Sequence, residues 1–201
     1  MIPSFHGAGG SITQQMAVDD LSDRKLNRDY IVVYMQGDAN DDGGITWQGA
    51  PGAEADDIGF TTEVIEFAQR TFCIDEARTY ATGKSQGGGF VRRLACDPAL
   101  SRRIAASAPV SGAYYIREVA REEGCDPGSV KVPYAAAAAA AVRPVPILAF
   151  HGGADRTIKY GGDFRRGACL LTVPHWAGLW ARRNCLDVAP QNTGIPRRQT
   201  G

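Results

Sequence analysis

Short apolar runs alternate with helix-like segments along this 201-residue chain. The runs at 30–37 (YIVVYMQG) and 145–155 (VPILAFHGGAD) have the length and the β-branched content of strands buried on both faces of a parallel sheet. The segment 103–112 (RIAASAPVSG) predicts another strand that ends in a loop, and the Gly- and Asp-rich residues 38–56 predict a loop.

Two longer segments carry apolar residues at helical spacing. In 56–72, Asp56 and Asp57 can each cap the N-terminus, and the apolar residues that share one face are Ile58, Val64, Ile65, Ala68 and Phe72. In 173–185, Trp176 and Trp180 fall on one side, which favours a place in the core over a binding surface. The alternation predicts an α/β fold with a mostly parallel sheet, helices on both faces, and functional groups at the carboxyl ends of the strands.

The stretch YATGKSQGGGF at 80–90 resembles two different motifs. A phosphate-binding loop is excluded, because it needs a glycine five residues before Gly83 and that position is Arg78. The pattern G-x-S-x-G fits, since a β-prone run precedes it, a helix-like run follows it, and Ser85 would stand exposed at the turn beside the Gln86 N–H. The alternative is a glycine-rich turn without chemistry.

Composition narrows the function classes. Lys+Arg and Asp+Glu are 22 each, so no broad field attracts nucleic acid or an acidic membrane, and no apolar run is long enough to span a bilayer. None of the five cysteines forms a C-x-x-C pair and the three histidines lie apart from them, so a zinc site is not expected. Buried thiols and long-range disulfides both stay open. We expect one domain over 1–201, with a variable polyalanine insertion at 135–141 and an irregular tail at 186–201.

Three predicted strand ends carry residues suited to acyl transfer, which needs a nucleophile, a base, an acid that orients the base, and donors for an oxyanion. Ser85 ends one strand and Asp155 ends another, in the chain order of an α/β-hydrolase site. The glycine-rich loop SFHGAGG at 4–10 offers N–H groups for an oxyanion.

The sequence also resembles a known family. The segments ATGKSQGGGFVRRLACDPALSRRIAASAPVSGAYY, PILAFHGGADRTIKYGG and RRGACLLTVPHWAGLWARRNC are similar to the secreted feruloyl esterases of fungi, carbohydrate esterases related to bacterial polyhydroxybutyrate depolymerases. YIVVYMQG, TWQGAPGAEADDIGFTTEVIEF and CIDEARTYATG match the same pattern, so the resemblance runs from about Pro3 to Cys185.

The resemblance implies roles for individual residues. Ser85 would be the nucleophile, Asp155 would orient a catalytic histidine, and the N–H groups of Gln86 and Ala8 would hold the oxyanion. The implied substrate is a feruloylated plant cell-wall polysaccharide, xylan or pectin, with no metal or cofactor, no nucleic acid and no membrane partner. The implied location is extracellular, with disulfides.

The family's catalytic histidine lies in a G-H-x-W-P-like segment that this sequence does not contain. His6 belongs to the oxyanion loop, His151 corresponds to a structural histidine, and His175 sits in the first turn of a helix without catalytic duty in the family. We therefore expect a chain shorter than the family at both ends and weakly active or inactive.

Two other functions stay open at this point. One is an acetylxylan esterase or polyester depolymerase, because the acyl pocket is not assignable and Trp47 fits a structural place as well as an acyl contact. The other is a non-catalytic module that binds carbohydrate or a protein partner.

Overall fold

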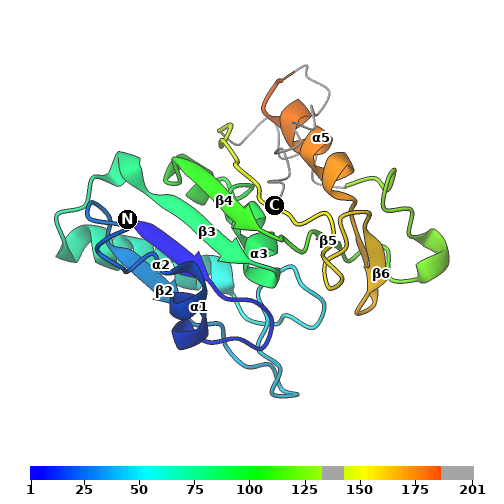
Figure 1. The fold of residues 1–201 in the computed structure, drawn as a ribbon, viewed down its shortest axis with the longest axis horizontal. Helices are drawn as coiled ribbons and strands as arrows, with labels where there is room; N and C mark the ends of the chain where they lie inside the picture. Colours follow the sequence, from blue (N-terminus) through cyan, green and yellow to red (C-terminus); the bar gives the residue numbers. More distant parts are fainter. Residues whose placement is uncertain (133–142, 187–201) are drawn as a thin grey trace, which may run out of the picture.

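The structure, a computed structural model, describes residues 1–132 and 143–186 (Figure 1). Along the chain the helices and strands are β1 (Ile2–Phe5), α1 (Ile12–Asp19), β2 (Val32–Met35), α2 (Asp57–Thr71), β3 (Tyr80–Lys84), α3 (Gln86–Leu94), β4 (Ala106–Val110), β5 (Tyr115–Ile116), β6 (Asp163–Arg165), β7 (Ala168–Leu170) and α5 (Val173–Arg183). Short 3-10 turns occupy Glu76–Arg78, Leu100–Arg102 and Glu122–Gly124. The predicted polyalanine insertion, and all of the predicted tail except Leu186, lie outside the described residues.

The main sheet has the order β2-β1-β3-β4, and all of its pairings are parallel. Phe5 pairs with Gly83, and Gly83 pairs with Pro109, so the carboxyl ends of three strands meet at one edge. A second, antiparallel sheet of order β5-β7-β6 lies beside it, below α5 in Figure 1. The predicted α/β fold with a mostly parallel sheet is confirmed.

Helices cover both faces of the main sheet, as adjacent residues of β1 show. Phe5 points to one face, where its ring lies 5.2 Å from that of Trp47 and 5.1 Å from that of Phe90 in α3. Ser4 points to the other face, where its hydroxyl donates to Asp19 of α1 at 2.6 Å. The first interface is apolar and the second is polar.

The helix α1 was not expected from the sequence. Its apolar side chains, Ile12, Met16 and Val18, are exposed, whereas Gln15 is buried against the sheet. The usual amphipathic pattern is inverted here, so the hydrophobic positions carry no helix signal.

The strand expected at 145–155 is present only in rudimentary form. It pairs with β4 through two isolated parallel bridges, Ser107 with Ile147 and Val110 with Phe150. The prediction of a strand buried on both faces is wrong, because Leu148 is 64% exposed and Phe150 is 51% exposed. In the described part of the chain nothing pairs with the other edge of this segment.

The run at 30–37 forms β2, which is an edge strand and not a central one. Of its four residues only Met35 is buried. An apolar run of strand length does not distinguish a central strand from an edge that loops and helices partly cover.

Both predicted helices are confirmed. Asp56 caps α2 by accepting a hydrogen bond from the Gly59 N–H at 3.0 Å. In α5, Trp176 and Trp180 belong to the main core, and Trp176 stacks on Tyr114 with ring centroids 3.8 Å apart.

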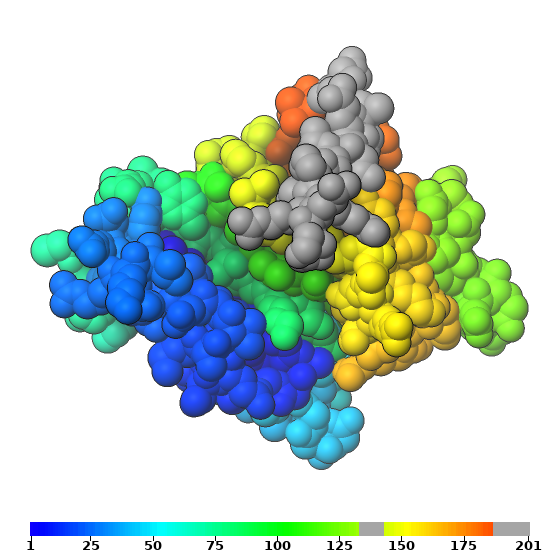
Figure 2. Space-filling model, in the orientation of Figure 1, coloured from blue at the N-terminus to red at the C-terminus, as the bar shows by residue number. Residues whose placement is uncertain are grey.

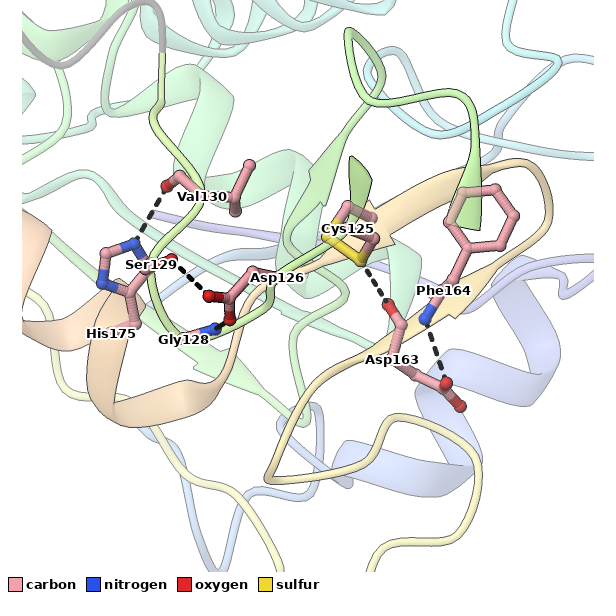
Figure 3. The surroundings of a disulfide bond; sticks show 9 residues. Cys125, Asp126, Gly128, Ser129, Val130, Asp163, Phe164 and His175 are labelled. Atoms are coloured by element: carbon pink, nitrogen blue, oxygen red, sulfur yellow. Dashed lines mark hydrogen bonds between the residues drawn. A yellow bond between two sulfur atoms is a disulfide. The ribbon is translucent and has the colours of Figure 1, made fainter. Parts of the chain in front are cut away.

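A disulfide joins Cys125 to Cys169 of β7, with the Cα atoms 5.3 Å apart (Figure 3). It fixes the loop after β5 to the small sheet. Cys73, Cys96 and Cys185 carry free thiols. Among the described helices, none has the length and apolar character needed to cross a membrane.

Candidate active site

The turn between β3 and α3 holds Ser85 in a strained conformation. Its φ of 56° and ψ of −117° lie in a region that non-glycine residues rarely adopt, at a cost of about 1–3 kcal/mol. The backbone is clamped there, because the Ser85 N–H donates to Val110 O at 2.9 Å and the Ser85 carbonyl accepts from Gly89 and Ala113 at 3.0 and 2.9 Å. The surrounding elements therefore impose the strain.

Two glycines of the turn lie where no side chain fits. A Cβ on Gly83 would stand 2.7 Å from the carbonyl carbon of Gly87, and a Cβ on Gly87 would stand 2.5 Å from the carbonyl oxygen of His6. This close approach brings the loop after β1 onto the turn, so that a Cβ on Gly7 would lie 3.5 Å from the Cβ of Ser85. The spacing G-x-S-x-G thus has a steric cause here.

The hydroxyl of Ser85 is not engaged in capping the helix that follows, although Ser85 occupies its N-cap position. Gln86 is the first residue of α3, and its N–H has no acceptor within the helix. The positive end of the helix dipole also lies here. A developing negative charge next to Ser85 would find a donor and a favourable field.

A cavity of about 610 Å³ opens at this edge of the sheet. Its lining brings together the four residues expected to form the site, Ala8, Ser85, Gln86 and Asp155. On the face seen in Figure 2, the blue N-terminal segment and the yellow 145–165 segment lie on opposite sides of the green centre.

Asp155 is held by donors from its own loop and from the next strand end. Its Oδ1 accepts from the N–H groups of Thr157 and Ile158 at 2.8 and 3.0 Å, and the Ser111 hydroxyl also bonds to it. Burial on its own would raise the pKa of Asp155, but these hydrogen bonds and the nearby His151 hold that pKa below its ordinary value. Asp155 is therefore ionised at neutral pH.

His6 has a structural role in the loop after β1. Its Nε2 accepts from the Gly37 N–H at 3.1 Å, so the proton sits on Nδ1 and is donated to the Gly7 carbonyl at 2.7 Å. Burial lowers the pKa of His6 and keeps the ring neutral. Trp47 is fully buried and donates from Nε1 to the His6 carbonyl at 2.8 Å. Of the two roles left open for Trp47, a structural one and a contact with the acyl group, these contacts support the structural one.

His151 lies beside Asp155 but in the wrong orientation for a base. Its Nε2 is 3.9 Å from Asp155 Oδ2 and donates to the Ile158 carbonyl at 2.7 Å, and its side chain is almost fully buried. In a serine hydrolase the base uses one nitrogen toward the acid and the other toward the serine. The protonated nitrogen of His151 is instead occupied by the loop that carries Asp155, and His151 does not line the cavity.

His175 lies away from the cavity, in the first turn of α5 (Figure 3). Its ring hydrogen-bonds to the Val130 carbonyl at 3.0 Å, on the side of the disulfide loop. Since the chain has three histidines, these contacts account for all of them. His6 is the one that lines the cavity in the described part of the chain, and its Nε2 lone pair is already used.

Several residues of the cavity were not foreseen. Ser111, at a φ of 46°, supports Asp155, and the basic residues Lys84, Arg165 and Arg166 belong to the lining of the cavity. Lys84 lies next to Ser85 in the G-x-S-x-G motif, so its position near the site could have been predicted from the sequence. The two arginines belong to the β6–β7 hairpin, which no sequence pattern predicted. Within residues 1–132 and 143–186, no group of three or more His, Cys, Asp or Glu side chains could hold a metal ion.

The known sequences that resemble this chain include two esterases. The chain is 31% identical over 203 aligned residues to feruloyl esterase B of Piromyces equi, covering 100% of this chain and 34% of that protein. It is 27% identical over 110 residues to a probable feruloyl esterase C of Aspergillus niger, covering 54% of this chain and 36% of that protein. The chain thus spans about a third of the length of the curated relatives it matches. No protein-family model matches it.

Solved structures show the same fold. The acetyl xylan esterase from Aspergillus awamori superposes with a TM-score of 0.63 at 17% identity, covering 90% of this chain and 69% of that one. A single-residue variant of SOBER1 from Arabidopsis thaliana gives a TM-score of 0.50 at 15% identity, covering 91% of this chain and 84% of that one. The described chain therefore has an α/β-hydrolase-like fold.

Proposed function

We propose that this chain, which belongs to a feruloyl esterase-like family, is a serine carboxylic-ester hydrolase of hydroxycinnamate esters on plant cell-wall polysaccharide. The observation that carries the proposal is the strained turn at Ser85, whose free hydroxyl shares a cavity with the ionised Asp155. A turn of this kind has a steric and energetic cost, and it presents a hydroxyl at a helix N-terminus.

In the proposed reaction, Ser85 Oγ attacks the ester carbonyl carbon. The oxyanion accepts hydrogen bonds from the N–H groups of Gln86 and Ala8, and the sugar hydroxyl leaves to give an acyl-Ser85 ester. Water then attacks the acyl carbon, which releases the acid and restores the Ser85 hydroxyl. No metal or organic cofactor takes part in these steps.

The proton of Ser85 needs an acceptor, and the three histidines of the chain are engaged elsewhere. Loss of the base from a serine hydrolase lowers the catalytic rate by a factor on the order of a million. We therefore propose slow turnover by this chain. Asp155 is positioned to orient an imidazole, but none of the three histidines of the chain lies between Asp155 and Ser85.

The names of the two sequence relatives support the hydroxycinnamate choice, and the fold neighbour that is an acetyl xylan esterase supports an acetyl ester as the second candidate. The disulfide between Cys125 and Cys169 supports an extracellular place, because such bonds persist in oxidising compartments. A carbohydrate-binding role without catalysis is the third candidate, and the occupied histidines favour it.

Hydrolysis assays separate these candidates. The unmodified chain and its Ser85→Ala variant are assayed on methyl ferulate and on acetylated xylan, with and without added imidazole. The proposal expects a small Ser85-dependent rate on methyl ferulate. Added imidazole should raise this rate by up to about 100-fold, which is the lower end of the range for general-base catalysis. A larger Ser85-dependent rate on acetylated xylan supports the second candidate. No Ser85-dependent rate on either substrate, even with imidazole, supports the binding role.

A further inference from the structure

The cavity at Ser85 is lined by more cations than anions. Its charged residues are Lys84, Asp155, Arg165 and Arg166, three positive and one negative, in a chain whose formal net charge is zero. The rest of the lining contributes no charge, since His6 is kept neutral by burial. We call Lys84, Arg165 and Arg166 the cationic rim.

The single carboxylate of the cavity does not neutralise the rim. Asp155 is already bonded by Thr157, Ile158 and Ser111. The nearest acid on the hairpin, Asp163, pairs with Lys159 at 2.6 Å, and the charge of Arg165 adds to that of Lys159 in lowering the pKa of Asp163. No salt bridge joins a rim residue to an acid within the described residues.

The rim is built from two separate parts of the fold. Lys84 ends β3 directly before the serine turn, whereas Arg165 ends β6 and Arg166 forms the β6–β7 turn at a φ of 53°. Lys84 and Arg166 are exposed, and Arg165 is half-buried with an Nε that is shielded from solvent and has no hydrogen-bond partner.

The exposed positions of Lys84 and Arg166 favour a ligand that extends out of the cavity. A polysaccharide does this, because a chain of many sugars is longer than a cavity of about 610 Å³ can hold. Sugars are neutral unless they carry a carboxylate, and guanidinium groups bind carboxylates through two parallel hydrogen bonds.

We propose that the cationic rim binds the carboxylate of a uronic-acid residue, so that the preferred substrate is an ester on an acidic polysaccharide. The inference rests on the proposed esterase function for the presence of the polysaccharide, but its test is a binding measurement that does not depend on turnover. A second source of the same chemistry is the carboxylate of the released hydroxycinnamic acid, and the test distinguishes the two.

The test uses two matched ligands that lack an ester. One is a xylo-oligosaccharide bearing a single glucuronate, and the other is the same molecule with its carboxylate reduced to an alcohol. Calorimetric titration of the unmodified chain is expected to give a Kd about tenfold lower for the glucuronate ligand, as two or three partly exposed charge contacts provide. The preference is expected to shrink as salt rises from about 0.1 M to about 1 M, because the screening length falls from about 10 Å to about 3 Å.

Matched variants locate the effect. The double variant Lys84→Gln/Arg166→Gln should bind both ligands equally, whereas Arg24→Gln/Lys25→Gln removes the same charge from exposed positions outside the cavity and should keep the preference. Unchanged melting temperatures show that both variants are folded. Free ferulate, titrated in parallel, should bind with little dependence on the rim.

Equal affinity of the unmodified chain for the two ligands overturns the proposal, as does a preference that survives in the rim variant. Rim-dependent binding of ferulate without rim-dependent binding of glucuronate overturns it in favour of a product site. Loss of the esterase function alone would appear as an unreactive Ser85 with the glucuronate preference intact.

Discussion

The two halves of the candidate site differ in how they are built. The Ser85 half consists of β1, β3, β4 and the start of α3, packed so closely that added methyl groups on Gly83 or Gly87 would overlap backbone atoms. The Asp155 half is a loop after a rudimentary edge segment, where a Cβ on Gly153 would meet nothing within 4 Å. Backbone hydrogen bonds hold the Asp155 carboxylate in this second half, and Ile158 anchors its loop in a small apolar cluster.

The difference follows from what each half has to do. A nucleophile at a strained turn needs a rigid surround, because the strain would otherwise relax. A carboxylate that orients another group needs ionisation and direction, and two donors of its own loop together with Ser111 after β4 supply both. The first half should therefore be intolerant of added volume, and the second should respond mainly to changes in charge.

The largest expected effect comes from adding one methyl group to the Ser85 half. Gly87→Ala should lower the free energy of unfolding by about 5 kcal/mol or prevent folding, since the new Cβ would stand 2.5 Å from the His6 carbonyl oxygen. Gly153→Ala in the Asp155 half should change it by less than about 0.5 kcal/mol. Urea denaturation of both variants measures the contrast, and equal stabilities would remove the basis of the comparison.

The disulfide should have the next largest effect. Replacing Cys125 and Cys169 together by alanine should lower the free energy of unfolding by about 3–4 kcal/mol, because the bond closes a loop with a sequence separation of 44. Thermal unfolding of the double variant against the unmodified chain under non-reducing conditions measures this. A loss below about 1 kcal/mol would show that the small sheet is held by other contacts.

Neutralising Asp155 should have a smaller, pH-dependent effect. Its pKa in the folded chain lies below the ordinary 3.8, so its stabilising contribution is present above that pH and is lost as the pH falls through the folded pKa. Asp155→Asn should therefore lower stability by about 1 kcal/mol at pH 7 and by less at pH 3. A stability difference that grows on acidification would contradict the assigned hydrogen bonds.

The smallest effect is expected from His175. His175→Gln should leave any Ser85-dependent hydrolysis within about twofold, because the ring bonds to Val130 and does not line the cavity. The same assay on Ser85→Ala provides the reference for complete loss. A loss of comparable size in His175→Gln would make this histidine the base.

The elements that the sequence predicted well are those whose side-chain pattern matches their surroundings. The serine turn and the tryptophan face of α5 bury the residues that their periodicity marks. The helix α2 buries Ile65 and Ala68 of its predicted face, but Phe72 is 49% exposed because the helix ends at Thr71. The helix α1 escaped prediction because it buries Gln15 and exposes Met16. The burial expected for 145–155 was wrong because burial of a strand depends on its neighbours, which the segment itself does not encode.

The candidate site shows the same division. Ser85 was identifiable because its turn imposes a local glycine pattern, and its shared cavity with Asp155 follows from strands that end at one edge. Two other features could not be predicted in this way. Ser111 and Asp155, like Lys84 and the arginines of the β6–β7 hairpin, belong to segments that come together only in the folded chain. No local sequence pattern predicts which distant segments come into contact.

The most direct test of the account is to treat the chain with a fluorophosphonate, with and without imidazole, and to map the adduct by mass spectrometry. The account predicts one slow adduct on Ser85, faster with imidazole and absent in Ser85→Ala. An adduct on another of the serines, or none on Ser85 even with imidazole, would contradict the claim that this turn presents a nucleophile.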